Sequence, residues 1–430
     1  MDYSLKRPCN LQDDNILAVN RNLSHISVDL ESVDNNAEEI DIQFIEDLIE
    51  NFQSFNKSDE IKKNHIWKEI TKPAFKLISE NLNSTNNLNN ILNNMFSTYL
   101  THGFDSGKEA NDACRDLENK FSANYIATVY FDKILLLAQA LSIIPSYNPE
   151  QSSYKFEGCI NELLRKIQSK VDFDITAPPF YGGNIGIKTD FGIHTMRTLM
   201  SIYITHSIKK EIPIDSKICE IGGGSGLQTY YLYKAGFRNI SIVDLPIANL
   251  CQGYFLKRNI HDIPVFLNNQ FSKTIREKSI ELLSPENFYL ADSSKWDVII
   301  NIDSIPEMPF KVGEKYINHI FNTNKFFISI NQESQALALD GQHQLNCHEI
   351  CKNFPTHVNK IRFPFWLRTG YVFEIWEPKV DSIENHIRNL ENHIRNIENT
   401  KLFKLNKFVK KIKNKLIKIK TKINIFKKIF

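Results

Sequence analysis

A glycine-rich turn between two apolar segments is the part of this sequence best suited to chemistry. Residues 218–221 are mostly apolar and form a segment short enough for a buried parallel strand, and five residues rich in glycine, 222–226, follow directly. Residues 227–235 have the composition of a helix, and a second apolar segment, 240–243, ends at Asp244. This order predicts a strand–turn–helix–strand unit with the glycines and Asp244 at one edge of a parallel sheet.

Such a unit is typical of a nucleoside site. Glycines allow the backbone to turn sharply and approach a ligand, and the N–H groups at the following helix N-terminus favour an electron-rich group. Asp244 lies 22 residues after Gly222, near the spacing of roughly 20 at which an acid binds ribose hydroxyls. Gly226 comes too early for a nicotinamide-binding G-x-G-x-x-G, and the Gly-Lys-Ser/Thr of a phosphate loop is missing. A glycine turn without a ligand is the alternative.

The motif E-I-G-G-G-S-G at 220–226, with Asp244, resembles the first motif and the second-strand acid of class I S-adenosylmethionine-dependent methyltransferases. Shorter pieces between about residues 120 and 378 are similar to the bacterial sugar O-methyltransferase family of surface-polysaccharide pathways. These pieces are D-L-P at 244–246, Y-F-L at 254–256, N-I-D-S-I-P-E-M at 301–308, N-P-E-Q at 148–151 and G-N at 183–184.

The resemblance implies S-adenosylmethionine as the cofactor. It places Glu220 and the glycines at the methionine part and Asp244 at the ribose. An acid before strand four, Asp292, would contact the adenine amino group. The implied cofactor-binding residues are Glu220, Gly222, Gly224, Gly226, Asp244, Leu245, Asp292 and Asn301.

Transfer of a methyl group to a hydroxyl requires donor and acceptor to be held in line and one proton to be removed. Asp303 and Glu307 follow the predicted strand four, where the transferred methyl is expected. Either carboxylate is a candidate base or a ligand for Mg²⁺, whereas helix capping is the alternative for Glu307. The sequence leaves further bases open, namely His194, His319 and His343, and we expect His194 and Arg197 to form walls of the site.

Alternating strand and helix patterns predict an α/β fold, a doubly wound Rossmann-like methyltransferase sheet over residues 177–380. The third strand has two candidate segments, residues 265–267 and residues 288–290. Strands are also expected at 298–301 and 326–330, with a final antiparallel pair at 361–365 and 371–376. Apolar stripes at helical spacing predict an N-terminal helical domain at 36–176, after a mobile lead-in at 1–35.

Composition limits the class of protein. Of 430 residues, 42% are hydrophobic, which is enough for a substantial core. Seven scattered cysteines suggest no disulfide framework, and the segment before residue 11 lacks the apolar core of a signal peptide, so we expect a cytoplasmic protein. A zinc site is suggested by Cys347 and Cys351 together with His343 and His348. The second ligand pair of a structural zinc site is missing, however.

The C-terminal residues differ from the rest in charge and pattern. Residues 381–400 contain a repeated I/L-E-N-H-I-R-N heptad, which predicts a short coiled coil and is compatible with a homo-oligomer. Residues 401–430 form an apolar stripe at helical spacing and contain twelve lysines and no acid, so the rest carries a net charge of 2 − 12 = −10. Such a basic amphipathic helix favours an anionic membrane surface. Continuation of the coiled coil is the alternative, and no nucleic acid is expected.

Two classes of function therefore stay open. The first is an S-adenosylmethionine-dependent O-methyltransferase that acts on a sugar hydroxyl in capsule or lipopolysaccharide biosynthesis, either free in the cytoplasm or peripheral on the inner face of the membrane. The alternative is a non-catalytic methyltransferase-like module that docks glycan-assembly proteins at the membrane, or a methyltransferase for another small molecule.

Truncation of the chain after Glu398 tests the membrane expectation. The full-length protein should sediment with anionic vesicles at low salt, because each lysine near the surface contributes about 1 kcal/mol, and the truncated protein should stay in the supernatant. High salt should weaken the attachment without abolishing it, since apolar burial is not screened. Full-length protein that ignores anionic vesicles would reassign the tail to oligomerisation.

Overall fold

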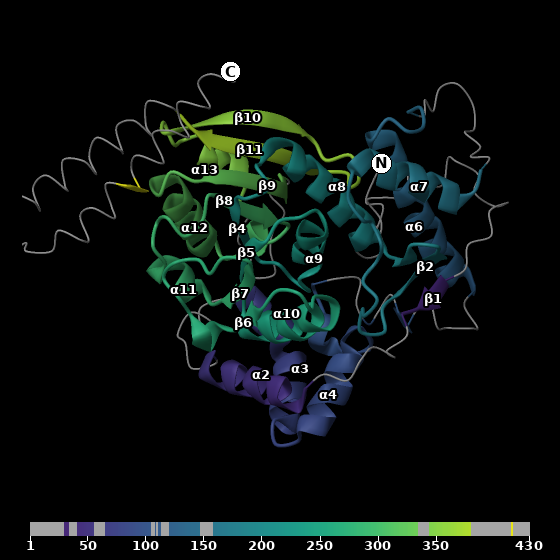
Figure 1. Cartoon of the computed structure of the whole chain (residues 1–430), viewed down its shortest axis with the longest axis horizontal. Helices are drawn as coiled ribbons and strands as arrows, with labels where there is room; N and C mark the ends of the chain where they lie inside the picture. The colour runs from purple at the N-terminus through teal and green to yellow at the C-terminus, as the bar shows by residue number, and fades with distance from the viewer. Residues whose placement is uncertain are drawn as a thin grey trace, which may run out of the picture.

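An eight-stranded, mostly parallel sheet forms the centre of a mixed α/β fold (Figure 1). The structure, a computed structural model, describes residues 30–33, 41–55, 65–104, 108, 111–112, 120–146, 158–333, 344–379 and 414–415. From edge to edge the strands are β10 (His357–Pro364), β11 (Tyr371–Pro378), β9 (Phe326–Gln332), β8 (Val298–Ile302), β4 (Lys217–Ile221), β5 (Asn239–Val243), β7 (Ser279–Leu283) and β6 (Val265–Phe266).

The predicted strand–turn–helix–strand unit is confirmed. β4 and β5 pair in parallel with Ile221 opposite Val243, and α9 (Leu227–Lys234) connects them. β8 pairs with the other side of β4, placing Asn301 opposite Ile221. The direction in which strands are added thus reverses between β4 and β8. In open α/β sheets this point, at the carboxyl ends of the strands, is where ligands bind.

The predicted antiparallel pair at the end of the sheet is also confirmed. β11 lies between β9 and β10 and is antiparallel to both. Tyr371, the first residue of β11, lies opposite Gln332 at the carboxyl end of β9. The turn at residues 365–370 therefore lies at the same edge of the sheet as the glycine turn.

Neither candidate for strand three was right. The strand that pairs with β5 is β7 (Ser279–Leu283), whereas Val265–Phe266 is only the edge strand β6. Residues 288–290 belong to α11 (Pro285–Leu290), which begins with Ser284 accepting a hydrogen bond from the Asn287 backbone N–H. β7 was not predicted as a strand from the sequence, because Glu281 interrupts its apolar pattern. That carboxylate is buried and binds Nζ of Lys295 at 3.1 Å.

Helices flank the sheet, as the sequence predicts. The predicted helix before strand one is α8, which Thr195 caps by accepting a hydrogen bond from the Thr198 backbone N–H. The helices after residue 195 are α8 (Met196–Glu211), α9, α10 (Pro246–Asn259), α11, α12 (Phe310–Asn322) and α13 (Cys347–Cys351).

The N-terminal helices share one hydrophobic core with the sheet. They are α2 (Ile42–Phe55), α3 (His65–Asn81), α4 (Thr85–Asn93), α6 (Lys120–Ala140) and α7 (Ile160–Val171). α2 lies directly on α10, because a Cβ on Gly253 would come within 2.6 Å of Leu48. The Tyr254 hydroxyl lies 2.6 Å from the side-chain oxygens of Asn89 and Asn93 on α4. These contacts fix the N-terminal helices against the helix that follows Asp244.

A second, three-stranded antiparallel sheet lies beside this core. It contains β1 (Leu30–Ser32), β2 (Ile185–Thr189) and β3 (Gly192–His194), in that order. The lead-in predicted for residues 1–35 is therefore wrong for residues 30–32, because pairing with β2 satisfies their backbone groups.

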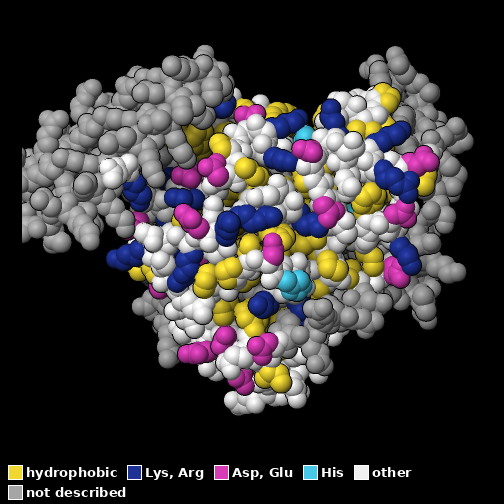
Figure 2. All heavy atoms as spheres, in the orientation of Figure 1, with side chains coloured by type: hydrophobic (Ala, Val, Ile, Leu, Met, Phe, Trp, Pro, Cys, Tyr) yellow, Lys and Arg dark blue, Asp and Glu magenta, His cyan; other side chains and the backbone are white. Residues whose placement is uncertain are grey.

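The predicted coiled coil and basic helix lie outside the described residues, except Asn414 and Lys415, which are helical. Among the helices that the structure describes, none combines the length and apolarity needed to cross a bilayer. On the face shown in Figure 2, Lys and Arg side chains are interspersed with Asp and Glu over the coloured surface, so charge of one sign does not dominate there.

Candidate active site

The glycine turn is shaped by close contacts with two neighbouring strands. Gly222 has φ +72° and donates its backbone N–H to the Val243 carbonyl at 2.8 Å. A Cβ at Gly222 would lie 2.1 Å from Oγ of Ser304, so both the backbone angle and the contact require glycine. Gly226, with φ +85°, is the N-cap of α9. The turn thus leads the chain from β4 into α9 at the predicted switch point.

Asp244 lies at this turn, as predicted, and its carboxylate is already engaged by the protein. Oδ2 accepts hydrogen bonds from the Gly224 N–H at 3.0 Å and from Nε2 of Gln252 at 2.8 Å, and Oδ1 accepts from the Leu245 N–H at 2.8 Å. Burial raises the pKa of Asp244 to about 6 although these bonds lower it. A carboxylate accepts about four hydrogen bonds, so this arrangement leaves room for one ribose hydroxyl, and a second must displace an internal donor.

Glu220 lies beneath the turn rather than along it. Its Oε2 accepts a hydrogen bond from the Thr229 hydroxyl at 2.9 Å, and a Cβ on Gly223 would lie 3.3 Å from the carboxylate. Burial raises the pKa of Glu220 to about 7, although the hydrogen bond from Thr229 lowers it. In this structure the side chain ties β4 to α9, and its implied contact with the methionine part stays a prediction.

Asn301 holds the strand-four loop in place. Its Nδ2 donates to the Ile221 carbonyl at 2.9 Å and to Oγ of Ser304 at 2.5 Å, and its Oδ1 accepts from Nδ2 of Asn331 at 2.9 Å and the Ile305 N–H at 3.3 Å. The residue is completely buried. All its polar atoms are therefore used internally, and Asn301 positions the loop instead of binding the cofactor as the resemblance implied.

Asp303 is the centre of a charged cluster directly after β8. Its carboxylate accepts hydrogen bonds from Arg368 and from the Tyr371 hydroxyl, and Nη1 of Arg197 lies 3.6 Å from Oδ2. Its φ of +56° places this non-glycine residue in the left-handed region, a conformation that the surrounding structure must impose. Burial raises the pKa of Asp303, but the two arginines and Tyr371 outweigh it and hold the pKa below its ordinary value.

Glu307 has the opposite electrostatic environment. It lies in the turn after Asp303, η8 (Ile305–Glu307). Burial, and then the negative charge of Asp303, raise the pKa of Glu307 to about 8, although Arg197 and Arg368 lower it. Two carboxyl groups whose pKa values are driven apart indicate an acid–base site, in which Asp303 stays ionised and Glu307 exchanges a proton near neutral pH.

The charged cluster depends on residues that sequence reasoning missed. Arg368 and Tyr371 belong to the β10–β11 turn and were predicted only as part of a strand pair. That turn is held from the other side by Lys133, a completely buried residue of α6 whose Nζ donates to the Leu367 carbonyl. The charged pair Asp132 and Lys133 within a largely apolar stretch is the signal in the sequence that points to such a contact. Arg197 was predicted as a wall of the site, and it does face Asp303.

His194 is not placed as a base. Its ring is completely buried, and Nδ1 lies 3.1 Å from the Thr198 hydroxyl at the start of α8. Burial lowers the pKa of His194 to about 4. The candidate base was wrong because the hairpin β2–β3 packs this side chain inward, and His194 serves the start of α8 instead.

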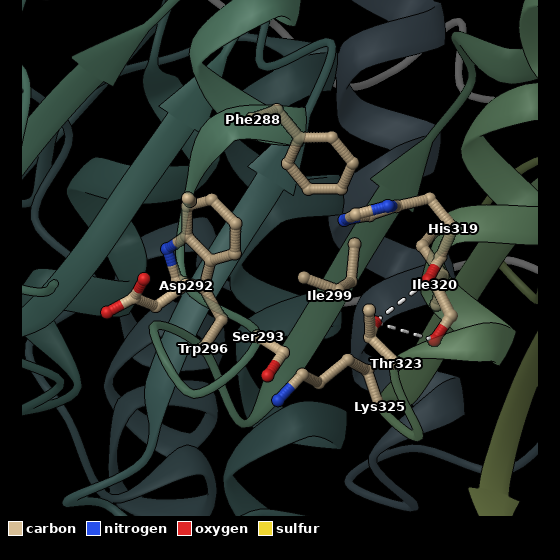
Figure 3. A pocket seen from close by; sticks show the side chains of 10 residues that line it. Phe288, Asp292, Ser293, Trp296, Ile299, His319, Ile320, Thr323 and Lys325 are labelled. Carbon is tan, nitrogen blue, oxygen red and sulfur yellow. Dashed lines mark hydrogen bonds between the residues drawn. The ribbon is translucent and has the colours of Figure 1, made fainter. Parts of the chain in front are cut away.

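Asp292 lies at the wrong edge of the sheet for the adenine role. It precedes β8 and, with His319 and Lys325, lines a cavity of about 10 Å³ beside the start of β8 and β9 (Figure 3). This volume holds no more than about one water molecule, and the glycine turn lies at the opposite ends of these strands. The expectation failed because the strand before β8 is β7, which ends at Leu283, and α11 then carries the chain to Asp292 at the start of β8. The same position removes His319 from the candidate bases, and His343 lies outside the described residues.

Metal ions do not fit the residues that were considered for them. Two guanidinium groups adjoin Asp303, so a bound Mg²⁺ there would add a third positive group. Burial raises the pKa values of Cys347 and Cys351, which opposes the thiolate form that zinc needs. Glu333, His348 and Glu374 have ligand atoms within 4.8 Å of one another, but Nη1 of Arg362 contacts all three, at 2.7, 3.2 and 2.7 Å.

Part of the N-terminal region covers the glycine turn. A Cβ built on Gly224 would lie 3.5 Å from the Phe104 carbonyl oxygen, and Nε2 of Gln252 on α10 donates to the Gly224 carbonyl at 3.0 Å. The turn is therefore enclosed by Phe104 on one side and by α10 on another. A ligand at Gly224 must share this space with the N-terminal region.

No family model and no curated protein matches this chain. Among solved structures, it is similar to magnesium protoporphyrin IX methyltransferase (ChlM) from Synechocystis PCC 6803 with bound SAM, at 12% identity over 42% of this chain and 83% of that one, with a TM-score of 0.29. The mitomycin 7-O-methyltransferase MmcR matches at 12% identity over 43% of this chain and 57% of that one, with a TM-score of 0.29. The glycopeptide N-methyltransferase MtfA, complexed with SAH, matches at 10% identity over 40% and 87%, with a TM-score of 0.27. A function for this chain therefore has to be inferred from its own residues.

Replacement of Asp244 tests the nucleoside site. We expect Asp244→Ala to weaken S-adenosylhomocysteine binding by about 1.5–3 kcal/mol, because a charged hydrogen-bond acceptor is lost. Wild-type affinity should also fall as the pH drops through about 6, where the raised pKa of Asp244 allows protonation. Isothermal titration measures both. Asp190→Ala, which removes a surface carboxylate bonded to Arg165, is the control. Unchanged affinity in Asp244→Ala would remove this residue from the site.

Replacement of Glu307 tests the acid–base pair. Glu307→Gln should lower turnover roughly 10²–10⁴-fold with little change in cofactor affinity. Because the base must be deprotonated, the wild-type rate should rise with pH through about 8. Asp303→Asn removes the negative charge that raises the Glu307 pKa, so its profile should move to lower pH. Glu314→Gln on α12 is the matched control. An unmoved profile in Asp303→Asn would contradict the coupling.

Proposed function

We propose that this chain is an S-adenosylmethionine-dependent O-methyltransferase that methylates a sugar hydroxyl in surface-polysaccharide biosynthesis. One observation carries the proposal. The Asp303–Glu307 pair, with its divided pKa values, follows β8, the neighbour of β4, and the glycine turn with Asp244 follows β4 and β5. A nucleoside site and an acid–base site thus occupy one edge of the sheet.

The residues at the turn fit a nucleoside-bearing cofactor. Asp244 has acceptor capacity left for a ribose hydroxyl, and Gly222 and Gly224 present backbone without side chains. Leu245 is half-buried beside Asp244 and offers an apolar contact to the adenine ring of the cofactor. S-adenosylmethionine would supply a methyl group on a sulfonium, which takes the electron pair of the C–S bond when that bond breaks.

Glu307 is the residue that would receive the acceptor proton. A sugar hydroxyl is a weak acid, and a general base works best when its pKa lies near the working pH. The pKa of Glu307, about 8, meets this condition. Asp303, held by Arg197, Arg368 and Tyr371, acts as a positioning residue whose negative charge adds to burial in raising this pKa. No metal ion is needed for this arrangement.

An exposed aromatic ring supports a sugar as the acceptor. Trp366 lies in the β10–β11 turn, two residues before Arg368, and is 45% exposed. Such rings present an apolar face on which the C–H side of a sugar ring packs. The similarity of residues 301–308 to sugar O-methyltransferases points to the same class of acceptor. Placement of the enzyme on the inner membrane face, through the basic tail, belongs to the same proposal.

Binding and methyl-transfer assays test this function. Full-length protein should bind S-adenosylmethionine in a calorimeter, and mass spectrometry of surface glycans should show a methylated sugar that disappears with the gene. A gene carrying Glu307→Gln should not restore it. Trp366→Ala should raise the KM for a sugar acceptor and leave cofactor affinity unchanged. A protein that binds no S-adenosylmethionine would instead be the non-catalytic docking module.

A further inference from the structure

A groove of about 260 Å³ is formed by elements that also support the active site. Its walls come from the end of α6, the end of α7, the second half of α8 and the β10–β11 hairpin. Figure 1 shows α8 between α7 and this hairpin. The volume is close to the lower end of the range for small-molecule pockets, roughly 300–1,000 Å³. A small molecule fits this space, whereas a polymer segment with several units does not.

The groove has an aromatic floor. Phe363 on β10 and Phe373 on β11 stack with their ring centroids 4.9 Å apart and their planes at 12°. Tyr203 of α8 lines the same space and is only half-buried. Phe373 is 1% exposed and backs the ring of Phe363, so the half-buried rings of Phe363 and Tyr203 offer the apolar surface on which a planar ligand ring packs.

The rim of the groove is positively charged. Lys170, at the end of α7, and Lys210, on α8, both line it and are exposed. Among the described residues, neither forms an ion pair. Glu211 also lines the groove, but its carboxylate lies 3.5 Å from Nζ of Lys360. The two lysines therefore face the groove with uncompensated charge, which suits an anionic group.

A buried histidine supplies a ring nitrogen without a partner. His206 lines the groove at 7% exposure, and its Nε2 has no hydrogen-bond partner among the described residues. Buried polar atoms are normally hydrogen-bonded, and an orphaned one requires an explanation. Nε2 has almost no accessible surface, so a ligand in the groove provides the missing partner once the ring turns toward it.

We propose that this groove binds a mononucleotide-like molecule, with a planar ring on Phe363 and Tyr203 and a phosphate between Lys170 and Lys210. His206 then completes its hydrogen bonding with a polar group of the ligand. The site is distinct from the glycine turn, because its residues lie on α7, α8 and the hairpin and not at the carboxyl ends of β4 and β5. It goes beyond the proposed methyl transfer and does not depend on it.

Titration of full-length protein with uridine 5′-monophosphate and guanosine 5′-monophosphate tests the site. Saturating S-adenosylhomocysteine keeps the nucleotides from the cofactor position. We expect binding of at least one of them in the calorimeter. Uridine, which lacks the phosphate, and ribose 5-phosphate, which lacks the ring, should both bind more weakly than uridine 5′-monophosphate. Failure of both nucleotides to bind at millimolar concentration would overturn the proposal.

Charge variants on α7 and α8 show where the nucleotide binds. Lys210→Gln and Lys170→Gln should each weaken binding about fivefold, as for an exposed ion pair, and the double variant about 25-fold. Lys209→Gln is the matched control, because Nζ of Lys209 binds the Asp172 carbonyl at 2.6 Å outside the groove. It should leave the affinity unchanged. Binding that survives the double variant, or that falls equally in Lys209→Gln, would place the nucleotide elsewhere and refute the site.

Discussion

The largely buried carboxylate of Asp303 forms the interactions on which the candidate active site depends. It joins α8 through Arg197, the end of β8 through its own backbone, and the β10–β11 turn through Arg368 and Tyr371. Removal of one partner is destabilising, because the remaining charge stays largely buried without compensation. The cluster therefore fixes the relative positions of three elements that are distant in the chain.

The same charge has a chemical consequence. Asp303 is kept ionised by two guanidinium groups, and its negative charge helps to raise the pKa of Glu307 to about 8. One residue thus supports the fold at this edge and sets the proton affinity of its neighbour. Without Asp303, burial alone would raise the pKa of Glu307.

Around this centre, hydrogen bonds join the strand-four loop to the glycine turn. Asn301 and Ser304 both donate to the Ile221 carbonyl at the end of β4, and Ser304 packs on Gly222. The N-terminal helices complete the enclosure, because Phe104 adjoins Gly224 and Lys133 holds the turn that carries Arg368. The nucleoside part and the acid–base part of the site are therefore one connected structure.

Much of the fold and half of the site could be read from the sequence, because they depend on neighbours in the chain. The glycine turn, Asp244 and the strand before Asp303 lie in continuous strand–loop patterns, so local periodicity and spacing identify them. The remainder depends on contacts between distant residues. Arg368 and Tyr371 are 65 and 68 positions from Asp303, and Lys133 is 234 positions from Leu367. Local sequence patterns do not predict contacts between such distant residues. They also do not predict that the side chains of His194 and Asn301 point inward. β7 was not predicted for the same reason. Its buried Glu281 is compensated by Lys295, and a contact of this kind is visible only in the folded structure.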